Sequence, residues 1–336
     1  MKQAMFQEAR DAKKVQCGLC SHRCIIVPDK RGICSVRENR DGILYTLVYD
    51  KVIARHIDPI EKKPLFHFLP GSLSYSIATP GCNFRCQHCQ NADISQLPRD
   101  HGDIILGEAV SPSAIVDAAL KNGCASISYT YTEPTIYFEL AYDTARLAAR
   151  AGLKNVFVSN GYITPEALRE IKPYLHAANI DLKGYTDDFY KKVCGARLQP
   201  VLDSIRLYHE LGIWIEITTL VIPGYNDSDD ELKGIAQFIR SVGQDIPWHV
   251  SRFHPTYKLT GQPITPIETL KRARQIGFDA GLRHVYEGNI PGEGEDTVCW
   301  SCKKTLVRRI GFSVLENMIK DSKCKFCGAV IEGVWS

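Results

Sequence analysis

The sequence predicts an α/β fold in which a parallel sheet curls into a partial barrel with helices outside it. Strand-like and helix-like runs alternate through the middle of the chain, and repeated βα units favour parallel strands covered by helices. Right-handed crossovers then curl the sheet. The predicted strands are 74–79, 125–131, 155–159, 177–182, 214–222 and 248–253. The predicted helices are 113–121, 136–151, 165–172, 200–211, 228–242 and 266–280.

Several predicted helices begin with a capping signal. Thr164 and Thr265 each stand directly before a proline, as does Ser111. A hydroxyl suits the N-cap of a helix, and proline suits its first turn. In barrels of this kind the chemistry lies at the C-terminal ends of the strands, so polar residues that follow a predicted strand are the candidates for function.

Composition and charge indicate a soluble protein. Of the 336 residues, 44% are hydrophobic and 24% are charged, which is ordinary for a globular domain. The net charge of +3 gives no support for nucleic acid or a membrane as the main partner. The polar N-terminus lacks the apolar core of a secretory signal, and no stretch approaches the roughly 20 apolar residues that cross a bilayer. We therefore expect a cytoplasmic protein with reduced cysteines.

Cysteine spacing divides the chain into three regions. Most of the 13 cysteines fall into spaced groups, and grouped reduced thiols point to metal. We predict an N-terminal Cys-rich metal-binding region over 1–70, a core barrel over 71–290 and a zinc-ribbon-like four-cysteine module over 291–336. Residues 291–296, Pro-Gly-Glu-Gly-Glu-Asp, are typical of a linker into the last region.

The central group is Cys82, Cys86 and Cys89, on a glycine-containing loop directly after the first predicted strand. Three close thiolates can ligate three irons of a [4Fe–4S] cluster and leave the fourth iron open to a small molecule. A structural zinc site needs four ligands, so zinc here would require His88 or a distant residue. The spacing and the strand context favour the cluster.

The pattern Cys-x3-Cys-x2-Cys, with the ring residue His88 before the last cysteine, resembles the radical S-adenosylmethionine (SAM) superfamily. Asn91 and its surroundings are similar to the branch that contains the pyruvate formate-lyase activating enzymes. The resemblance implies a partial (β/α)6 radical SAM barrel, with the Cys-rich segment and the zinc-ribbon-like module attached. It also implies that SAM binds the open iron and yields a 5′-deoxyadenosyl radical, which removes hydrogen from a substrate. A low-potential electron donor, flavodoxin or ferredoxin, is the implied partner.

Polar residues at the ends of successive predicted strands resemble the SAM-binding motifs of this superfamily. Glu133 stands where the family receives the SAM amino group, although Tyr131 and Thr132 replace the two glycines that usually precede it. A carboxylate suits an ammonium group there. The further SAM contacts that the resemblance implies are Ser159, Asn160 and Asp181 near the ribose, Lys183 at the carboxylate, Ile222 beside the adenine, and His254.

The C-terminal cysteines Cys299, Cys302, Cys324 and Cys327 form two Cys-x2-Cys pairs. Four thiolates close a tetrahedral site. So short a region cannot bury much core, and bound metal would supply its folding free energy. Zinc is the first expectation, and a single rubredoxin-like iron is the second.

The N-terminal cysteines Cys17, Cys20, Cys24 and Cys34 also have metal-like spacing, with His22 as a spare ligand. Zinc and an auxiliary iron–sulfur cluster both fit this group, and zinc is preferred because nothing in the spacing demands iron. A metal shared by the two terminal groups is a further alternative if the termini meet.

With this three-part plan, the whole chain resembles the AmmeMemoRadiSam-system radical SAM proteins. Segments 17–24 and 248–255 carry much of the likeness. Memo-like and AMMECR-type proteins are therefore implied as partners, while the substrate stays open between a protein residue, as for the activating enzymes, and a small molecule. The alternative function is a non-catalytic iron–sulfur electron carrier or a zinc-stabilised scaffold, which would not explain Glu133, Lys183 and His254.

Four other residues receive no functional role at this point. Cys124 begins a strand and is interpreted as a buried thiol that packs as a small hydrophobe. Cys194 lies nearer the active face, and a structural role is preferred for it as well. Lys62 and Lys63 are interpreted as solvated surface.

Overall fold

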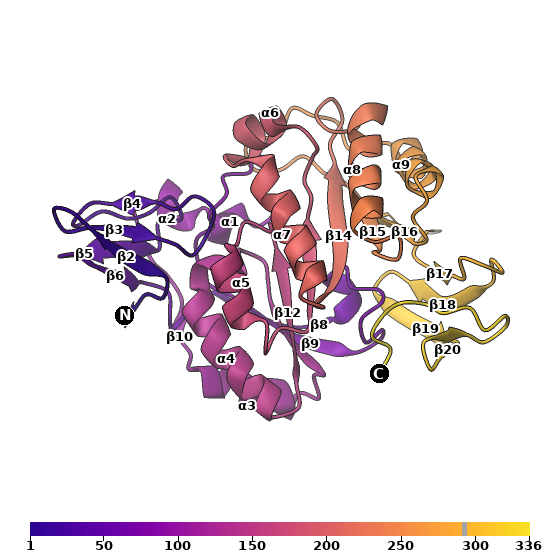
Figure 1. Cartoon of the computed structure of the whole chain (residues 1–336), viewed down its shortest axis with the longest axis horizontal. Helices are drawn as coiled ribbons and strands as arrows, with labels where there is room; N and C mark the ends of the chain where they lie inside the picture. Colours follow the sequence, from indigo (N-terminus) through magenta and orange to yellow (C-terminus); the bar gives the residue numbers. More distant parts are fainter. Residues whose placement is uncertain (291–293) are drawn as a thin grey trace.

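An eight-stranded sheet lies at the centre of the computed structural model, which describes residues 1–290 and 294–336 (Figure 1). The strand order is β16-β15-β14-β13-β12-β11-β9-β8. Every strand that the sequence predicts is present, and all of them run parallel. They are β9 (Leu73–Ala78), β11 (Ser126–Tyr129), β12 (Lys154–Ser159), β13 (Ala177–Asp181), β14 (Trp214–Val221) and β15 (Trp248–Arg252).

Two strands that the sequence analysis missed extend the sheet at its edges. β16 (Val285–Gly288) pairs parallel with β15, and β8 (Ala54–Pro59) pairs antiparallel with β9. Because β8 belongs to the first predicted region, that region contributes an edge strand to the core sheet.

Amphipathic helices cover the outer face of the sheet (Figure 1). In α8, for example, the side chains of Leu232, Ile235 and Ile239 are fully buried on one face of the helix, as expected for a helix that packs on a sheet. The covering helices agree with the predicted ones: α3 (Pro112–Lys121), α4 (Phe138–Arg150), α5 (Pro165–Ile171), α7 (Leu198–Glu210), α8 (Asp229–Val242) and α9 (Ile267–Asp279). Shorter helical turns are η1 (Ile60–Lys62), α1 (Ala92–Ser95), α2 (Leu97–Asp100), η2 (Pro134–Tyr137), α6 (Asp187–Phe189) and η3 (Tyr190–Cys194).

Two of the three predicted caps are confirmed. The hydroxyl of Ser111 accepts from the backbone N–H of Ala114, and that of Thr164 accepts from Ala167. The prediction for Thr265 is wrong, because its hydroxyl accepts from the N–H of Phe253 at 2.9 Å and donates to the carbonyl of Val221 at 2.6 Å. Thr265 therefore ties the ends of two neighbouring strands instead of capping α9.

The N-terminal region forms small antiparallel sheets at one end of the molecule (Figure 1). A buried ion pair joins this region to α4: Nη1 of Arg37 lies 3.0 Å from Oε2 of Glu139. The same two side chains hold the backbone of Met5. Its strands are β1 (Lys2–Gln3), β2 (Gln7–Arg10), β3 (Lys14–Cys17), β4 (Ile25–Ile26), β5 (Arg37–Arg40) and β6 (Ile43–Thr46), with β7 (Lys51–Val52) paired to β10 (Glu108–Ala109).

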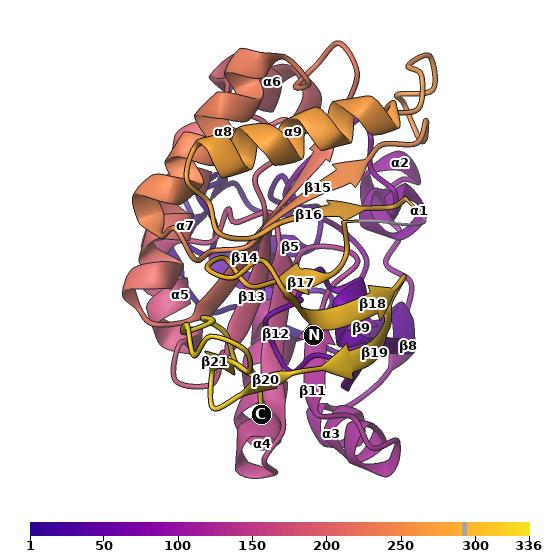
Figure 2. The ribbon, with the colours of Figure 1, turned by 90° about the vertical axis from the view of Figure 1, so that its right-hand side faces the viewer.

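The C-terminal region packs at the other end of the molecule (Figure 1), where it contacts β16 through the hydroxyls of Tyr286 and Thr297, 2.8 Å apart, and lies near the start of β9 (Figure 2). The guanidinium of Arg309 donates to the carbonyl of Phe66 at 2.7 Å. The last residues pair with the segment after η1, since the N–H of Val334 donates to the carbonyl of His67. The strands are β17 (Thr297–Val298), β18 (Thr305–Ile310), β19 (Ser313–Asn317), β20 (Ile319–Lys320) and β21 (Lys323–Cys324).

Two remaining expectations concern the predicted linker before the C-terminal region and membrane-spanning segments. Residues 291–293 of the predicted linker lie outside the described residues. Among the helices that the structure describes, none has both the length and the apolarity to span a bilayer.

Candidate active site and metal centres

A cavity of about 420 Å³ lies at the C-terminal ends of the parallel strands. This is the position at which βα barrels place their chemistry. Most of the residues predicted for the central cluster and for SAM line its wall, and they come from the ends of β9, β11, β12 and β13. They are Cys82, Cys86, Cys89, Glu133, Ser159, Asn160, Asp181 and Lys183.

The three central cysteines lie on the loop after β9. Gly81 begins this loop with φ +99°, a backbone conformation that glycine adopts readily. Polar hydrogens face two of the sulfur atoms: the N–H of Phe84 is 3.4 Å from Sγ of Cys82, and the hydroxyl of Ser95 is 3.1 Å from Sγ of Cys89. Such contacts suit thiolates that bind a metal.

The donor set fits a three-thiolate iron site. The three central thiols line one cavity, and three thiolates leave one iron of a cubane without a protein thiolate. Burial raises the pKa of Cys82 and of Cys89, so both thiols need a cation to become thiolates. Within the described ranges, neither His88 nor any other group completes a set of three ligand atoms within 4.8 Å of one another here.

Cys194 lies against the cysteine loop. Its carbonyl accepts from the N–H of Arg85 at 2.8 Å, and the carbonyl of Val193 accepts from the N–H of Gln87 at 3.0 Å. A hydrogen bond with Cys194 lowers the pKa of Cys86, against the opposing effect of burial. The segment η3 therefore supports the loop from outside the cavity.

Glu133 is almost fully buried, and its carboxylate joins the ends of β11 and β12. It accepts from the N–H and hydroxyl of Thr135 at 3.0 and 2.6 Å, from the hydroxyl of Ser159 at 2.8 Å and from the N–H of Asn160 at 2.8 Å. A carboxylate has about four acceptor positions. Three of these hydrogen bonds end on Oε1 and one on Oε2, so Oε2 keeps an acceptor position for the expected ammonium group.

Lys183 brings a positive charge to the cavity. Its Nζ lies 2.7 Å from Oδ2 of Asp181. Burial lowers the pKa of Lys183, but the charges of Asp181 and Cys86 more than offset this effect and raise it above its ordinary value. A lysine that keeps its proton is a good partner for a ligand carboxylate.

Ile222 and His254 do not join the other predicted residues at the cavity wall. The backbone N–H of Ile222 donates to Oδ1 of Asn226 at 2.6 Å, and Nδ2 of Asn226 donates to the carbonyl of Lys183 at 2.7 Å. Asn226 thus connects the ends of β13 and β14. His254 is exposed to solvent.

The sequence analysis missed part of the cavity wall. Lys62, Lys63 and Phe312 line the cavity. The interpretation of Lys63 as solvated surface is wrong, because the residue is 1% exposed. Its Nζ lies 2.6 Å from Oδ2 of Asp58, which also accepts from the hydroxyl of Tyr131. The acidic residue near the end of β8, followed closely by two lysines, was the available signal.

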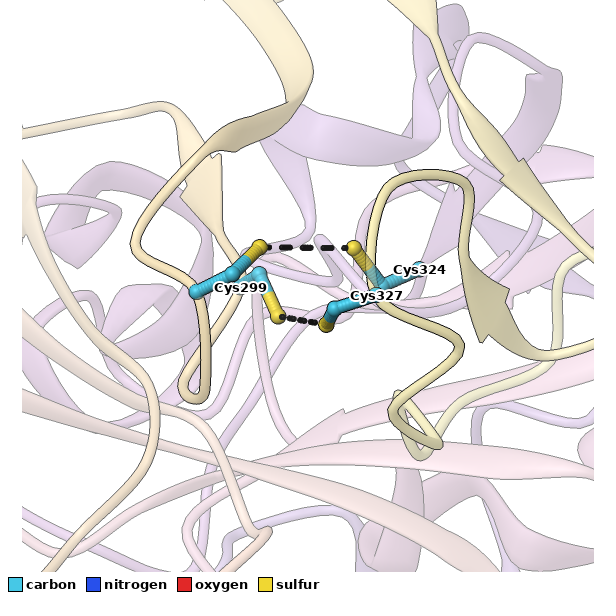
Figure 3. A group of neighbouring side chains, drawn as sticks. Cys299, Cys324 and Cys327 are labelled. Carbon is cyan, nitrogen blue, oxygen red and sulfur yellow. Dashed lines mark hydrogen bonds between the residues drawn. The ribbon is translucent and has the colours of Figure 1, made fainter.

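The C-terminal cysteines form a compact site (Figure 3). Sγ of Cys299 lies 3.7 Å from that of Cys327, and Sγ of Cys302 lies 3.7 Å from that of Cys324. Zinc–sulfur bonds of about 2.3 Å in a tetrahedron put the sulfur atoms about 3.8 Å apart. The backbone N–H of Ala329 is the main cause that lowers the pKa of Cys327 to about 7. The site therefore has the size and chemistry of a single tetrahedral metal.

The N-terminal cysteines line a second, mostly apolar cavity together with His22. This group lies in the N-terminal region, at the opposite end of the molecule from the C-terminal region (Figure 1). The alternative in which the two terminal groups share one metal is therefore wrong.

Known proteins with this architecture provide the family. The chain matches the Radical SAM superfamily over residues 76–239. It is 48% identical over 336 residues to the uncharacterized protein MJ0808 of Methanocaldococcus jannaschii, with 99% of each chain covered. It is 21% identical over 211 residues to the pyruvate formate-lyase 1-activating enzyme of Escherichia coli, over 58% of this chain and 85% of that one. A radical SAM methyltransferase from Sphaerobacter thermophilus has a similar fold, with a TM-score of 0.51, 15% identity and 71% of each chain covered.

The fold and the cavity define a barrel enzyme with a three-thiol centre at the strand ends. The chain belongs to the radical SAM superfamily and is an enzyme. Membership implies a [4Fe–4S] cluster, SAM, and a reductant such as flavodoxin or ferredoxin.

Proposed function

We propose that Cys82, Cys86 and Cys89 ligate the [4Fe–4S] cluster and that the enzyme removes a hydrogen atom from its substrate. When bound, the cluster and SAM supply a 5′-deoxyadenosyl radical. The observation that carries the proposal is the meeting of these thiols and the ammonium group of Lys183 in one cavity. Four thiolates would saturate a cubane, whereas three leave a position for SAM.

The neighbouring side chains have distinct proposed roles. Lys183, held by Asp181, would bind the SAM carboxylate. Ser159 and Asn160 would contact the ribose, since the Glu133 carboxylate fixes both at the end of β12. Glu133 itself would hold Ser159 and Asn160 in position. A direct contact between its carboxylate and the SAM amino group is the alternative role. For Ile222 and His254, contacts with SAM stay predictions.

A small molecule with an anionic group is the proposed class of substrate. Lys62, Lys63 and Phe312 add walls to the cavity from outside the parallel strands, and such walls limit the approach of a protein backbone. The two lysines exceed the single charge of Asp58, their ion-pair partner, which favours a negatively charged group. A glycyl residue of a protein, as for the activating enzymes, is the competing substrate.

The flanking regions have proposed roles of their own. We propose that 1–70 and 291–336 are metal-binding regions around the barrel of 71–290, with β8 as the part of the first region that joins the sheet. Zinc is proposed for the C-terminal four-cysteine site. The free cysteines of the described chain support a reducing, cytoplasmic location. Association with Memo-like and AMMECR-type proteins stays a prediction.

The test is anaerobic reconstitution with iron and sulfide, followed by dithionite and SAM. The enzyme should release 5′-deoxyadenosine, and Cys86→Ala should abolish this release. Cys124→Ala is the matched control, because Cys124 is a buried thiol just before β11, at the end of the sheet away from the cavity. A reduced cluster whose electron paramagnetic resonance (EPR) signal does not change on addition of SAM would instead support an electron carrier.

A further inference from the structure

We propose that Cys17, Cys20, Cys24 and Cys34 hold a second [4Fe–4S] cluster, which passes electrons to the cluster of the active site. The relay role rests on the proposed function of the barrel, whereas the identity of the second cluster does not. The preference for zinc that the sequence suggested at this group is therefore reversed.

The spacing of the N-terminal thiols is the first argument. All four line one cavity. Yet within residues 1–290 and 294–336, only the C-terminal cysteines form a set of three or more ligand atoms within 4.8 Å of one another. One tetrahedral ion draws its sulfur ligands to about 3.8 Å apart. In a cubane each thiolate binds a different iron, so the sulfurs stand farther apart. Within the described residues, the N-terminal thiols therefore share a cavity without being drawn together as those of the C-terminal site are.

The surroundings of the thiols are the second argument. Leu19, Ile26 and Ile136 form apolar walls around the sulfur atoms. The backbone closes the loop tightly, since the N–H of Cys17 donates to the carbonyl of Cys24 at 2.9 Å. Arg37 also lines this cavity and is 2% exposed. Its charge is already paired with Glu139, so the shell around the sulfur atoms is mainly apolar, and such a shell excludes solvent from a metal centre and tunes its potential.

A direct contact between the two cysteine loops is the third argument. Nε2 of His22, two residues after Cys20, lies 2.8 Å from the carbonyl oxygen of Asn83, the residue after Cys82. The side chain of Asn83 in turn accepts from Nδ2 of Asn160 at 2.7 Å. One hydrogen bond therefore joins the two groups of ligands.

The backbones of the two loops also touch. A Cβ atom at Gly81 would lie 2.6 Å from Cγ1 of Val36 and 3.1 Å from the carbonyl oxygen of Cys34, and φ at Gly81 is +99°, so glycine is required for this approach. Arg99 bridges the same loops, because its guanidinium donates to the carbonyl of Ile33 at 2.8 Å and to that of Phe84 at 3.4 Å. Two metal centres packed this closely can exchange an electron.

The position of the N-terminal group relative to solvent gives the direction of transfer. Cys20 and Cys24 are partly exposed, and the group lies in the outer region of the chain. A low-potential one-electron donor would reduce the second cluster from the 2+ to the 1+ state. The electron then reduces the active-site cluster, and the second cluster returns to 2+. No bond forms or breaks in this step.

Metal content of two matched triple variants tests the cluster. Cys82→Ala/Cys86→Ala/Cys89→Ala should keep about four irons per chain after anaerobic reconstitution, with a reduced EPR signal that SAM does not alter. Cys17→Ala/Cys20→Ala/Cys24→Ala should also keep about four irons, with a signal that SAM does alter. The unsubstituted chain should hold about eight, which tests the count even if a variant fails to fold.

The alternatives give different results. An N-terminal zinc site would leave the first variant without iron and the unsubstituted chain with about four irons and two zinc ions, which overturns the second cluster. If the EPR signal of Cys17→Ala/Cys20→Ala/Cys24→Ala does not change on addition of SAM, the proposed function is overturned. The proposal of a second cluster is not affected by that result.

The relay has its own test. His22→Phe should keep the iron content and slow the reduction of the active-site cluster by reduced flavodoxin several-fold in stopped-flow absorbance. His101→Phe, at an exposed histidine, is the matched control and should leave the rate unchanged. An unchanged rate in His22→Phe with both clusters present would overturn the relay.

Discussion

The buried ion pair between Arg37 and Glu139 should be a main attachment of the N-terminal region to the barrel. The two side chains are 2% and 0% exposed. In Glu139→Gln, the amide can still accept from the N–H of Met5, but it no longer neutralises the guanidinium. Arginine cannot escape by losing its proton. Removing one partner of a buried pair costs about 3–5 kcal/mol, because the other charge stays buried without compensation.

The expected shift in Tm follows from the size of the chain. Unfolding entropy of about 2.1 cal/mol/K per residue gives about 0.7 kcal/mol/K for 336 residues, so the loss corresponds to about 4–7 °C. Anaerobic thermal unfolding followed by circular dichroism measures it. Limited proteolysis should also show earlier cleavage within residues 1–50.

The control is a solvent-exposed ion pair that also joins the N-terminal region to a helix of the barrel. Arg23 of the N-terminal region donates to Glu166 of α5 at 2.9 Å, and these side chains are 45% and 57% exposed. Exposed pairs contribute about 0–1 kcal/mol, so Glu166→Gln should lower Tm by less than about 1.5 °C. Equal shifts in the two variants would refute the reasoning from burial.

Three further predictions concern other parts of the molecule. Burial lowers the pKa of His284 to about 3, so as the pH falls this residue takes up a proton in the unfolded chain before it does so in the folded protein. Between pH 7.5 and 5.5 the free energy of unfolding should therefore fall by about 1.4 kcal/mol more in the unsubstituted protein than in His284→Phe, as urea titrations will measure. Equal losses would contradict this assignment. Cys299→Ser should release about one zinc per chain and lower Tm without loss of iron, as metal analysis will show; loss of iron would indicate a rubredoxin-like site instead. Asp58→Asn should lower the free energy of unfolding by about 2–3 kcal/mol, which is less than the loss in Glu139→Gln, because the buried Lys63 can lose its proton and Arg37 cannot. A loss below about 1 kcal/mol would mean that Lys63 is not held by this carboxylate.

Much of the fold could be predicted because the strands and helices of the core have clear hydrophobic patterns in the sequence. Strands such as β12 and β14 are buried on both faces, and they show as β-branched and apolar runs between turn signals. β8 and β16 escaped detection for physical reasons. β8 lies at an edge and carries charged side chains, and β16 has only four residues. The role of Thr265 also depended on tertiary contacts, since a capping hydroxyl and a strand-tying hydroxyl are identical in sequence.

The candidate site was predictable wherever residues follow strands directly. Cys82, Asn160 and Lys183 lie in the cavity because parallel strands end at one edge of the sheet. Lys63 could not be placed in this way, because its burial depends on tertiary contacts of the segment after η1: the carbonyl of Pro64 accepts from Asn179 of β13, and the N–H of Phe66 donates to Glu216 of β14. Distance in sequence also hid Phe312, which reaches the cavity from the turn between β18 and β19.

That turn has a consequence for how such enzymes can diversify. The hairpin of β18 and β19 is anchored by Arg309, which is 4% exposed, whereas Phe312 at its tip is 48% exposed. Substitution or lengthening of the tip would reshape the cavity without disturbing the three central thiols or the sheet. If the proposed function holds, the substrate preference of such an enzyme can change through this turn, while the residues proposed to hold the cluster and SAM stay the same.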